Sequence, residues 1–119
     1  MDAHGYLKFK WVADILYVHA FGPFNEEGVA KATSEYIALI SVKDSSSYSI
    51  IEVWDTESLG SPKVMSEVSK MWAFLLKNNC TFIAIVVSNS LQKAVCEKLL
   101  PSKGKVFLNI EDAENWINK

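Results

Sequence analysis

Few residues in this chain have the type and spacing that chemistry requires. The two histidines, His4 and His19, are not spaced as metal ligands, and neither a CxxC nor an HExxH pattern accompanies them. The glycine patterns that hold dinucleotides or ATP phosphates are absent, as is the GxSxG pattern of a nucleophilic serine. We therefore expect a protein that is not an enzyme and that uses no metal or cofactor.

One catalytic alternative stays open, in which Asp55, Glu57 and His19 act together. It requires the three side chains to converge within hydrogen-bond reach of one pocket. His19 shares a strand face with Ile15 and Tyr17 by alternation, which gives no reason to place it beside the two acids.

Composition limits the function classes further. The 119 residues suit one domain spanning 1–119, and the net charge of -2 without a basic run argues against nucleic-acid binding. Cys80 and Cys96 are expected to be buried free thiols, which predicts a reducing, cytoplasmic setting. The longest apolar run, 82–87, is too short for a transmembrane segment, and the first ten residues lack the apolar core of a signal segment.

Hydrophobic periodicity predicts nine elements. Strands are expected at 6–12, 15–21, 48–54, 81–87 and 105–108, the first two forming a hairpin. Helices are expected to begin after Asn25, Ser61, the segment 88–90 and Asn109. Each is predicted to have one apolar face. In chain order, these faces are Val29, Thr33, Tyr36, Ile37 and Ile40 on the first helix; Val64, Met65, Val68, Met71, Trp72, Leu75 and Leu76 on the second; Leu91, Ala94, Val95 and Leu99 on the third; and Ile110, Ala113, Trp116 and Ile117 on the fourth. The order β-β-α-β-α-β-α-β-α predicts an α/β fold with a mixed, mostly parallel sheet packed with helices.

The loop at 19–28, with the sequence HAFGPFNEEG, joins a strand to a helix and so resembles an anion-binding turn. Glu26 and Glu27, however, follow the N-cap Asn25 directly, and their carboxylates already occupy the positive end of the helix dipole. The turn is therefore poorly suited to phosphate, and helix capping explains most of its composition. If the middle strands run parallel, this loop meets 55–61 and 88–90 at the carboxyl edge of the sheet.

Apolar groups in these loops suggest a docking surface. Phe21, Pro23, Phe24 and Leu59 would form an apolar patch rimmed by acids and hydroxyls, a composition that fits a protein partner. In the alternative, the phenylalanines fold under the helices as hydrophobic staples.

Three features resemble the SpoIIAA-like proteins, relatives of the STAS domain. They are the GPFN turn at 22–25, the acidic, hydroxyl-bearing connection after the third strand, and the ending VFLNIEDAENWI at 106–117. The resemblance covers essentially the whole chain and implies a non-enzymatic regulatory or binding domain.

STAS antagonists carry a phosphorylated Ser or Thr in an Asp-Ser-Ser-Gly type motif. Asp55 and Thr56 match that place in type, whereas Glu57 and Ser58 depart from it, and Glu57 would repel a phosphate on Thr56. The apolar patch and the segment marked by the resemblance together give the expected partner or regulatory surface, which comprises Phe21, Pro23, Phe24, Asp55, Thr56, Glu57, Ser58 and Leu59.

Two functions follow. The first is an interaction module that binds a protein partner or a second copy of itself. The second, suggested by the family's likeness to Sec14-type domains, is a carrier or sensor of a lipid or small apolar ligand. A closed core with Trp11 outside would favour the module, and an open cleft beneath the helix of Val29 to Ile40 would favour the carrier.

Overall fold

The computed structural model describes residues 2–43 and 46–119 and contains the nine predicted elements in the predicted order. The strand and helix boundaries lie within one or two residues of the predicted ones, and the polar loop after the first helix falls partly outside the described residues. The elements are β1 (Tyr6–Val12), β2 (Ile15–Phe21), α1 (Glu26–Ser41), β3 (Tyr48–Trp54), α2 (Pro62–Leu76), β4 (Cys80–Val86), α3 (Ser90–Leu99), β5 (Gly104–Phe107) and α4 (Ile110–Ile117).

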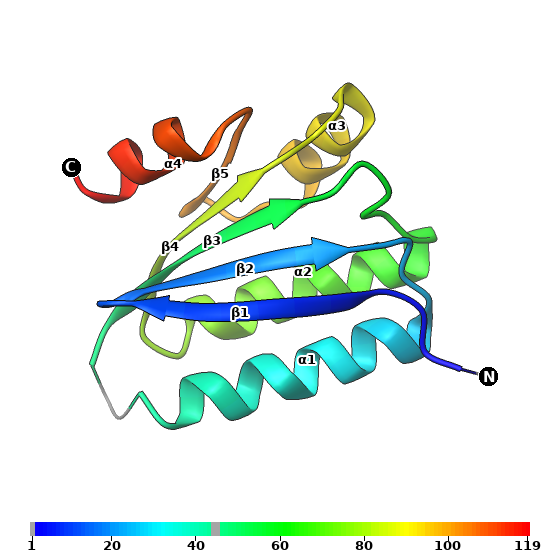
Figure 1. Cartoon of the computed structure of the whole chain (residues 1–119), viewed down its shortest axis with the longest axis horizontal. Coiled ribbons are helices and arrows are strands. Elements are labelled where there is room, and N and C mark those ends of the chain that lie inside the picture. Colours follow the sequence, from blue (N-terminus) through cyan, green and yellow to red (C-terminus); the bar gives the residue numbers. More distant parts are fainter. Residues whose placement is uncertain (1, 44–45) are drawn as a thin grey trace.

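The five strands form one mixed sheet in the order β1-β2-β3-β4-β5, with β1 antiparallel to β2 and the other pairs parallel (Figure 1). The helices begin where capping predicts, because Asn25, Ser61, Asn89 and Asn109 each accept a hydrogen bond from a backbone N–H of the first turn. The mixed α/β fold predicted from periodicity is confirmed.

The two faces of the sheet are covered unequally. Helices α1, α2 and α3 pack on one face, where Leu16, Ile50 and Trp72 lie in the main core. Helix α4 packs on the other face over β3, β4 and β5 through a smaller cluster around Ala84 and Ala113 (Figure 1). It also meets Ile15 and Tyr17 at the start of β2, and leaves β1 and the second half of β2 uncovered on this face. Within the described residues, no helix is both long and apolar enough to cross a bilayer.

Four expectations about side chains need correction. On α1, Ile37 was predicted on the inner face but is 40% exposed. On α3 the buried residues are Gln92 and Cys96, whereas Leu91 is 63% exposed and Ala94 is also exposed. The Gln92 amide is drawn inward because Oε1 accepts from Ser88 N at 2.8 Å and Nε2 donates to the Asp55 carbonyl at 2.6 Å. The inner face of α3 therefore keeps the predicted Val95 and Leu99, which pack against the main core, and adds Gln92 and Cys96 in place of Leu91 and Ala94.

The other two corrections concern the first residue of α4 and the edge strand β1. Ile110 lies largely outside the core, since α4 begins there, past the end of β5. Trp11 is half-buried rather than free at the edge, because its ring meets Tyr48 edge-on at 5.8 Å between centroids and Lys43 Nζ lies 4.7 Å from it. The Trp11 side chain therefore packs against the main core from the edge of the sheet.

Candidate functional site

The three loops predicted to meet at the carboxyl edge of the parallel strands do meet. Gly22 N donates to Asp55 Oδ1 at 3.3 Å, and Phe24 N donates to the Leu59 carbonyl at 2.9 Å. The amide of Asn89, the cap of α3, donates to the Thr56 carbonyl at 3.2 Å. These bonds join loops from three parts of the chain into one rim above the sheet.

The two hydroxyls after β3 have different environments. Ser58 is 2% exposed, and its Oγ lies 2.7 Å from both the Ala20 carbonyl and Asp55 Oδ1. Thr56 is exposed at the tip of the turn, beside the exposed Glu57. Ser58 therefore holds the loop together from inside, and Thr56 is the hydroxyl of this turn that lies at the surface.

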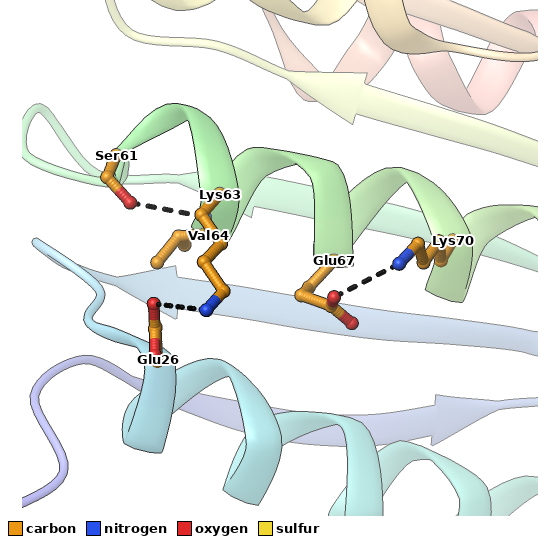
Figure 2. A network of polar contacts seen from close by, with 6 residues as sticks. All are labelled: Glu26, Ser61, Lys63, Val64, Glu67 and Lys70. Atoms are coloured by element: carbon orange, nitrogen blue, oxygen red, sulfur yellow. Dashed lines mark hydrogen bonds and ion pairs between the residues drawn. The ribbon is translucent and has the colours of Figure 1, made fainter.

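The turn before α1 is a structural cap, as its composition predicts. Asn25 Oδ1 accepts from Gly28 N at 2.8 Å and also from His4 N at 2.8 Å, which fastens the N-terminal segment to the helix. Glu26 forms an ion pair with Lys63 of α2 at 3.3 Å and so links the first turns of the two helices (Figure 2). Both side chains are exposed, so this pair adds little to stability.

The apolar residues of the predicted patch are divided between the two faces of the sheet. Phe24 and Leu59 turn toward the helices and pack against the main core. Phe21 stacks on Tyr6, with ring centroids 4.9 Å apart. Pro23, which lies between Phe21 and Phe24 in the sequence, is exposed. Phe24 thus agrees with the staple alternative, whereas Phe21 belongs to the uncovered face of β1 and β2.

An apolar cavity of about 40 Å³ lies between the sheet and the helices α1 and α2. This exceeds the ~10–15 Å³ that one buried water occupies. Partly exposed side chains form its rim, namely Leu7, Phe24, Leu59 and Val68. Its deeper wall consists of Ala20, Val29, Ala32, Tyr36, Glu52, Trp54, Ser58, Val64, Met65 and Met71.

Glu52 is the charged group of this cavity, and it is 3% exposed. Its Oε2 accepts from the Tyr36 hydroxyl at 2.6 Å and from Trp72 Nε1 at 3.2 Å, and its Oε1 accepts from Trp54 Nε1 at 3.0 Å. The partners come from α1, α2 and the same strand β3. The tertiary packing of the two long helices therefore builds the polar floor of the cavity.

Burial raises the pKa of Glu52 above its ordinary value of 4.5, and the three hydrogen bonds lower that pKa in part. Burial also raises the pKa of Tyr36 well above 10, and the adjacent Glu52 charge adds to the rise. The tyrosine therefore stays protonated and keeps its hydrogen bond to the carboxyl group across the physiological range.

Sequence reasoning missed Glu52, although a signal was present. The strand YSIIEVW alternates, so Ile50, Glu52 and Trp54 share one face. A lone acid on a face otherwise apolar is unusual, because an ionisable group is seldom fully buried without a partner. The hydrogen-bonding partners Tyr36 and Trp72 could not be identified, since they lie 16 and 20 residues away in the chain.

The residues of the catalytic alternative do not form one hydrogen-bonded group. His19 is exposed on the uncovered sheet face, 6.5 Å from Phe21 between ring centroids. Asp55 Oδ1 accepts hydrogen bonds from Gly22 N, Glu57 N and the Ser58 hydroxyl, all of them in the loops at the carboxyl edge of the sheet. Cys80 and Cys96 are free and buried as predicted, and burial raises the pKa of each thiol to about 12, which disfavours the reactive thiolate.

Comparison with known proteins identifies the fold. No family model and no curated protein matches the sequence. Among solved structures, the chain is similar to an uncharacterized protein of the DUF3478 family with a SpoIIAA-like fold from Shewanella loihica PV-4. The TM-score is 0.65 at 16% identity, and the alignment covers 98% of this chain and 95% of that one. At this identity the likeness concerns architecture, and the chain has a SpoIIAA-like fold.

Proposed function

We propose that the protein is a non-enzymatic binding domain that takes up a small, mainly apolar ligand between its sheet and the helices α1 and α2. The supporting observation is the apolar cavity with the carboxyl group of Glu52 at its floor. It lies beneath Val29, Ala32 and Tyr36 of α1, the helix under which the carrier hypothesis expects an open cleft. Ligand sites in proteins commonly combine apolar walls with a few oriented polar groups.

The volume of about 40 Å³ suits only a small group unless the walls move. Met65 and Met71 line the cavity, and the methionine side chain, which is unbranched and flexible, can adopt other rotamers around a guest. The half-buried rim residues Phe24 and Leu59 give a path inward from the loops. A larger ligand would therefore enter from the carboxyl edge of the sheet.

Native mass spectrometry of gently purified protein tests this proposal. The variant Ala32→Leu adds three carbon atoms to the cavity wall, whereas Ala30→Leu adds the same atoms on the exposed side of α1. We expect a retained small molecule on the unmodified chain and on Ala30→Leu, and its loss from Ala32→Leu. As a second test, toluene is added to the unmodified protein as a small apolar probe, and the methyl resonances of the methionines are followed by NMR. Bare protein in all three mass-spectrometry samples, together with unshifted methyl resonances, would overturn the proposal.

A second function, self-association, is favoured by the uncovered face of β1 and β2. Tyr6 is 52% exposed on this face and stacks on Phe21, while Lys8 and Lys10 project beside it. Helix α4 packs on the same side of the sheet (Figure 1). Its first turn exposes Glu111 and Asp112. A two-fold axis between these regions would set the lysines of one copy against the carboxylates of the other.

Charge reversal tests the dimer. By sedimentation equilibrium we expect the unmodified chain to dimerise, and the double variants Lys8→Glu/Lys10→Glu and Glu111→Lys/Asp112→Lys each to remain monomeric. Mixing the two variants should restore a dimer, because both contacts then join opposite charges. A monomeric unmodified chain at high concentration and low salt would exclude this second function.

A further inference from the structure

Within residues 2–43 and 46–119, Glu52 has no counter-ion. Its three hydrogen-bonding partners are neutral, and an indole N–H can only donate. Among the described residues the ion pairs are Lys63 with Glu26 and Lys70 with Glu67, so no lysine pairs with Glu52. An ionised Glu52 would therefore be a buried negative charge held by dipoles alone, an arrangement that a cation would stabilise.

The carboxyl group also retains unused hydrogen-bonding capacity. An ionised carboxylate has about four acceptor positions. Oε2 uses two of them, for Tyr36 and Trp72, and Oε1 uses one, for Trp54. One position on Oε1 thus remains for a donor, and Glu52 is among the residues that line the cavity.

Aromatic side chains stand beside this carboxyl group. Tyr36 and Trp54 line the same cavity, and the Trp54 and Trp72 rings lie 6.3 Å apart at an interplanar angle of 27°. Both indoles turn their N–H edges toward Glu52 and stack on each other, so they orient the carboxyl group. The negative charge of an ionised Glu52 therefore favours a cationic donor over an anion, which the carboxylate would repel.

We propose that the ligand carries a protonated amine on a small apolar body, with its N–H donating to Glu52 Oε1 and its hydrocarbon part lying against Met65, Met71 and Leu59. This inference rests on the proposed binding function and adds the chemical class of the ligand. The cavity of about 40 Å³ takes the ammonium end, and the body extends toward the rim at Phe24 and Leu59.

The indole N–H resonances of Trp54 and Trp72 are direct reporters of this contact, because both groups donate to Glu52. They can be assigned with Trp54→Phe and Trp72→Phe and followed by ¹H–¹⁵N NMR. Three probes of matched size are added separately: n-propylammonium, 1-propanol and propionate. We expect propylammonium to shift both indole signals with a Kd about tenfold below that of propanol, and propionate to shift neither.

The variant Glu52→Gln keeps the size of the side chain and removes its charge. It should abolish the preference for propylammonium over propanol. Glu57→Gln alters an exposed acid of the loop after β3 and should preserve that preference. In the unmodified protein, the affinity for propylammonium should also rise with pH as Glu52 ionises, and that for propanol should not. This second measurement does not depend on whether Glu52→Gln folds.

The outcomes separate the two proposals. If propanol binds as tightly as propylammonium, or if the pH dependence is absent, the amine inference fails and the binding function stands. If none of the probes shifts the indole signals and Ala32→Leu has no effect in mass spectrometry, both fail. An uncharged or anionic molecule identified on the purified protein would likewise contradict the amine inference alone.

Discussion

At Glu52 the folded chain holds a carboxyl group whose ionisation is linked to stability. Its pKa is raised in the folded state, so the folded protein binds this proton more tightly than the unfolded chain does. The stability that this proton contributes is present below pH 4.5 and is lost as the pH rises from 4.5 through the raised pKa. The titratable neighbours Tyr36, Cys80 and Cys96 all have raised pKa values and stay protonated in this window.

Urea unfolding of the unmodified protein and of Glu52→Gln should reveal this linkage. We expect the free energy of unfolding of the unmodified chain, measured relative to the variant, to fall as the pH rises from 4.5 toward neutral. Exposed acids titrate alike in both proteins and cancel in the difference. A difference that stays constant or grows with pH would show that Glu52 is not destabilised in its charged form.

Trp72 is the largest fully buried side chain, and it also donates to Glu52. Trp72→Ala should lower the free energy of unfolding by about 3–5 kcal/mol, because it empties a core site. Phe74→Ala, on the same helix but 41% exposed, should cost less than about 1 kcal/mol. Equal losses in denaturant melts would contradict the assignment of the inner face of α2.

The hydroxyls of the turn after β3 make a matched pair. Thr56→Ala should leave stability within about 0.5 kcal/mol, since the side chain is exposed. Ser58→Ala should cost about 1–3 kcal/mol, because it removes a buried hydroxyl that lies 2.7 Å from both the Ala20 carbonyl and Asp55 Oδ1. Thermal melts of both variants test these two values. A large loss of stability for Thr56→Ala would identify Thr56 as a structural cap.

At the scale of the element, the start of α1 depends on a close approach that helix propensity does not reveal. In an isolated helix Gly28→Ala would gain about 1 kcal/mol. Here a Cβ on residue 28 would run into the carbonyl of His4, whose N–H is bound to the cap Asn25. We therefore expect Gly28→Ala to destabilise the full chain in thermal melts.

Deletion of residues 1–5 is the control for this prediction, because it removes the His4 carbonyl. In the shortened chain Gly28→Ala should become neutral or stabilising. The same sign of effect in both backgrounds would mean that the contact between His4 and α1 does not restrict residue 28.

At the scale of the whole molecule, the two cores share the central strands. Ile50 and Ile51 are successive residues of β3 that point into the main core and the α4 cluster, and β4 contributes Ile83 and Ala84 in the same way. We expect one cooperative unfolding transition. Far-ultraviolet and near-ultraviolet circular dichroism should give coincident melts, and an earlier near-ultraviolet change would show that α4 separates first.

The sequence alone determined the element order and the mixed sheet, because periodicity and capping act over a few neighbouring residues. Asn25, Ser61 and Asn109 cap their helices as predicted. The meeting of the three loops also followed from the sequence, since parallel strands end at a common edge.

Only the tertiary structure decided which polar groups are buried and what they contact. Gln92 replaced Leu91 on the inner face of α3 because its amide reaches the Asp55 carbonyl, 37 residues away in sequence. Glu52 acquired its cavity and its partners Tyr36 and Trp72 when α1 and α2 packed together on the sheet. Local patterns identify the element to which a residue belongs and the face on which it lies. Its partners depend on distant segments that meet only in the folded chain.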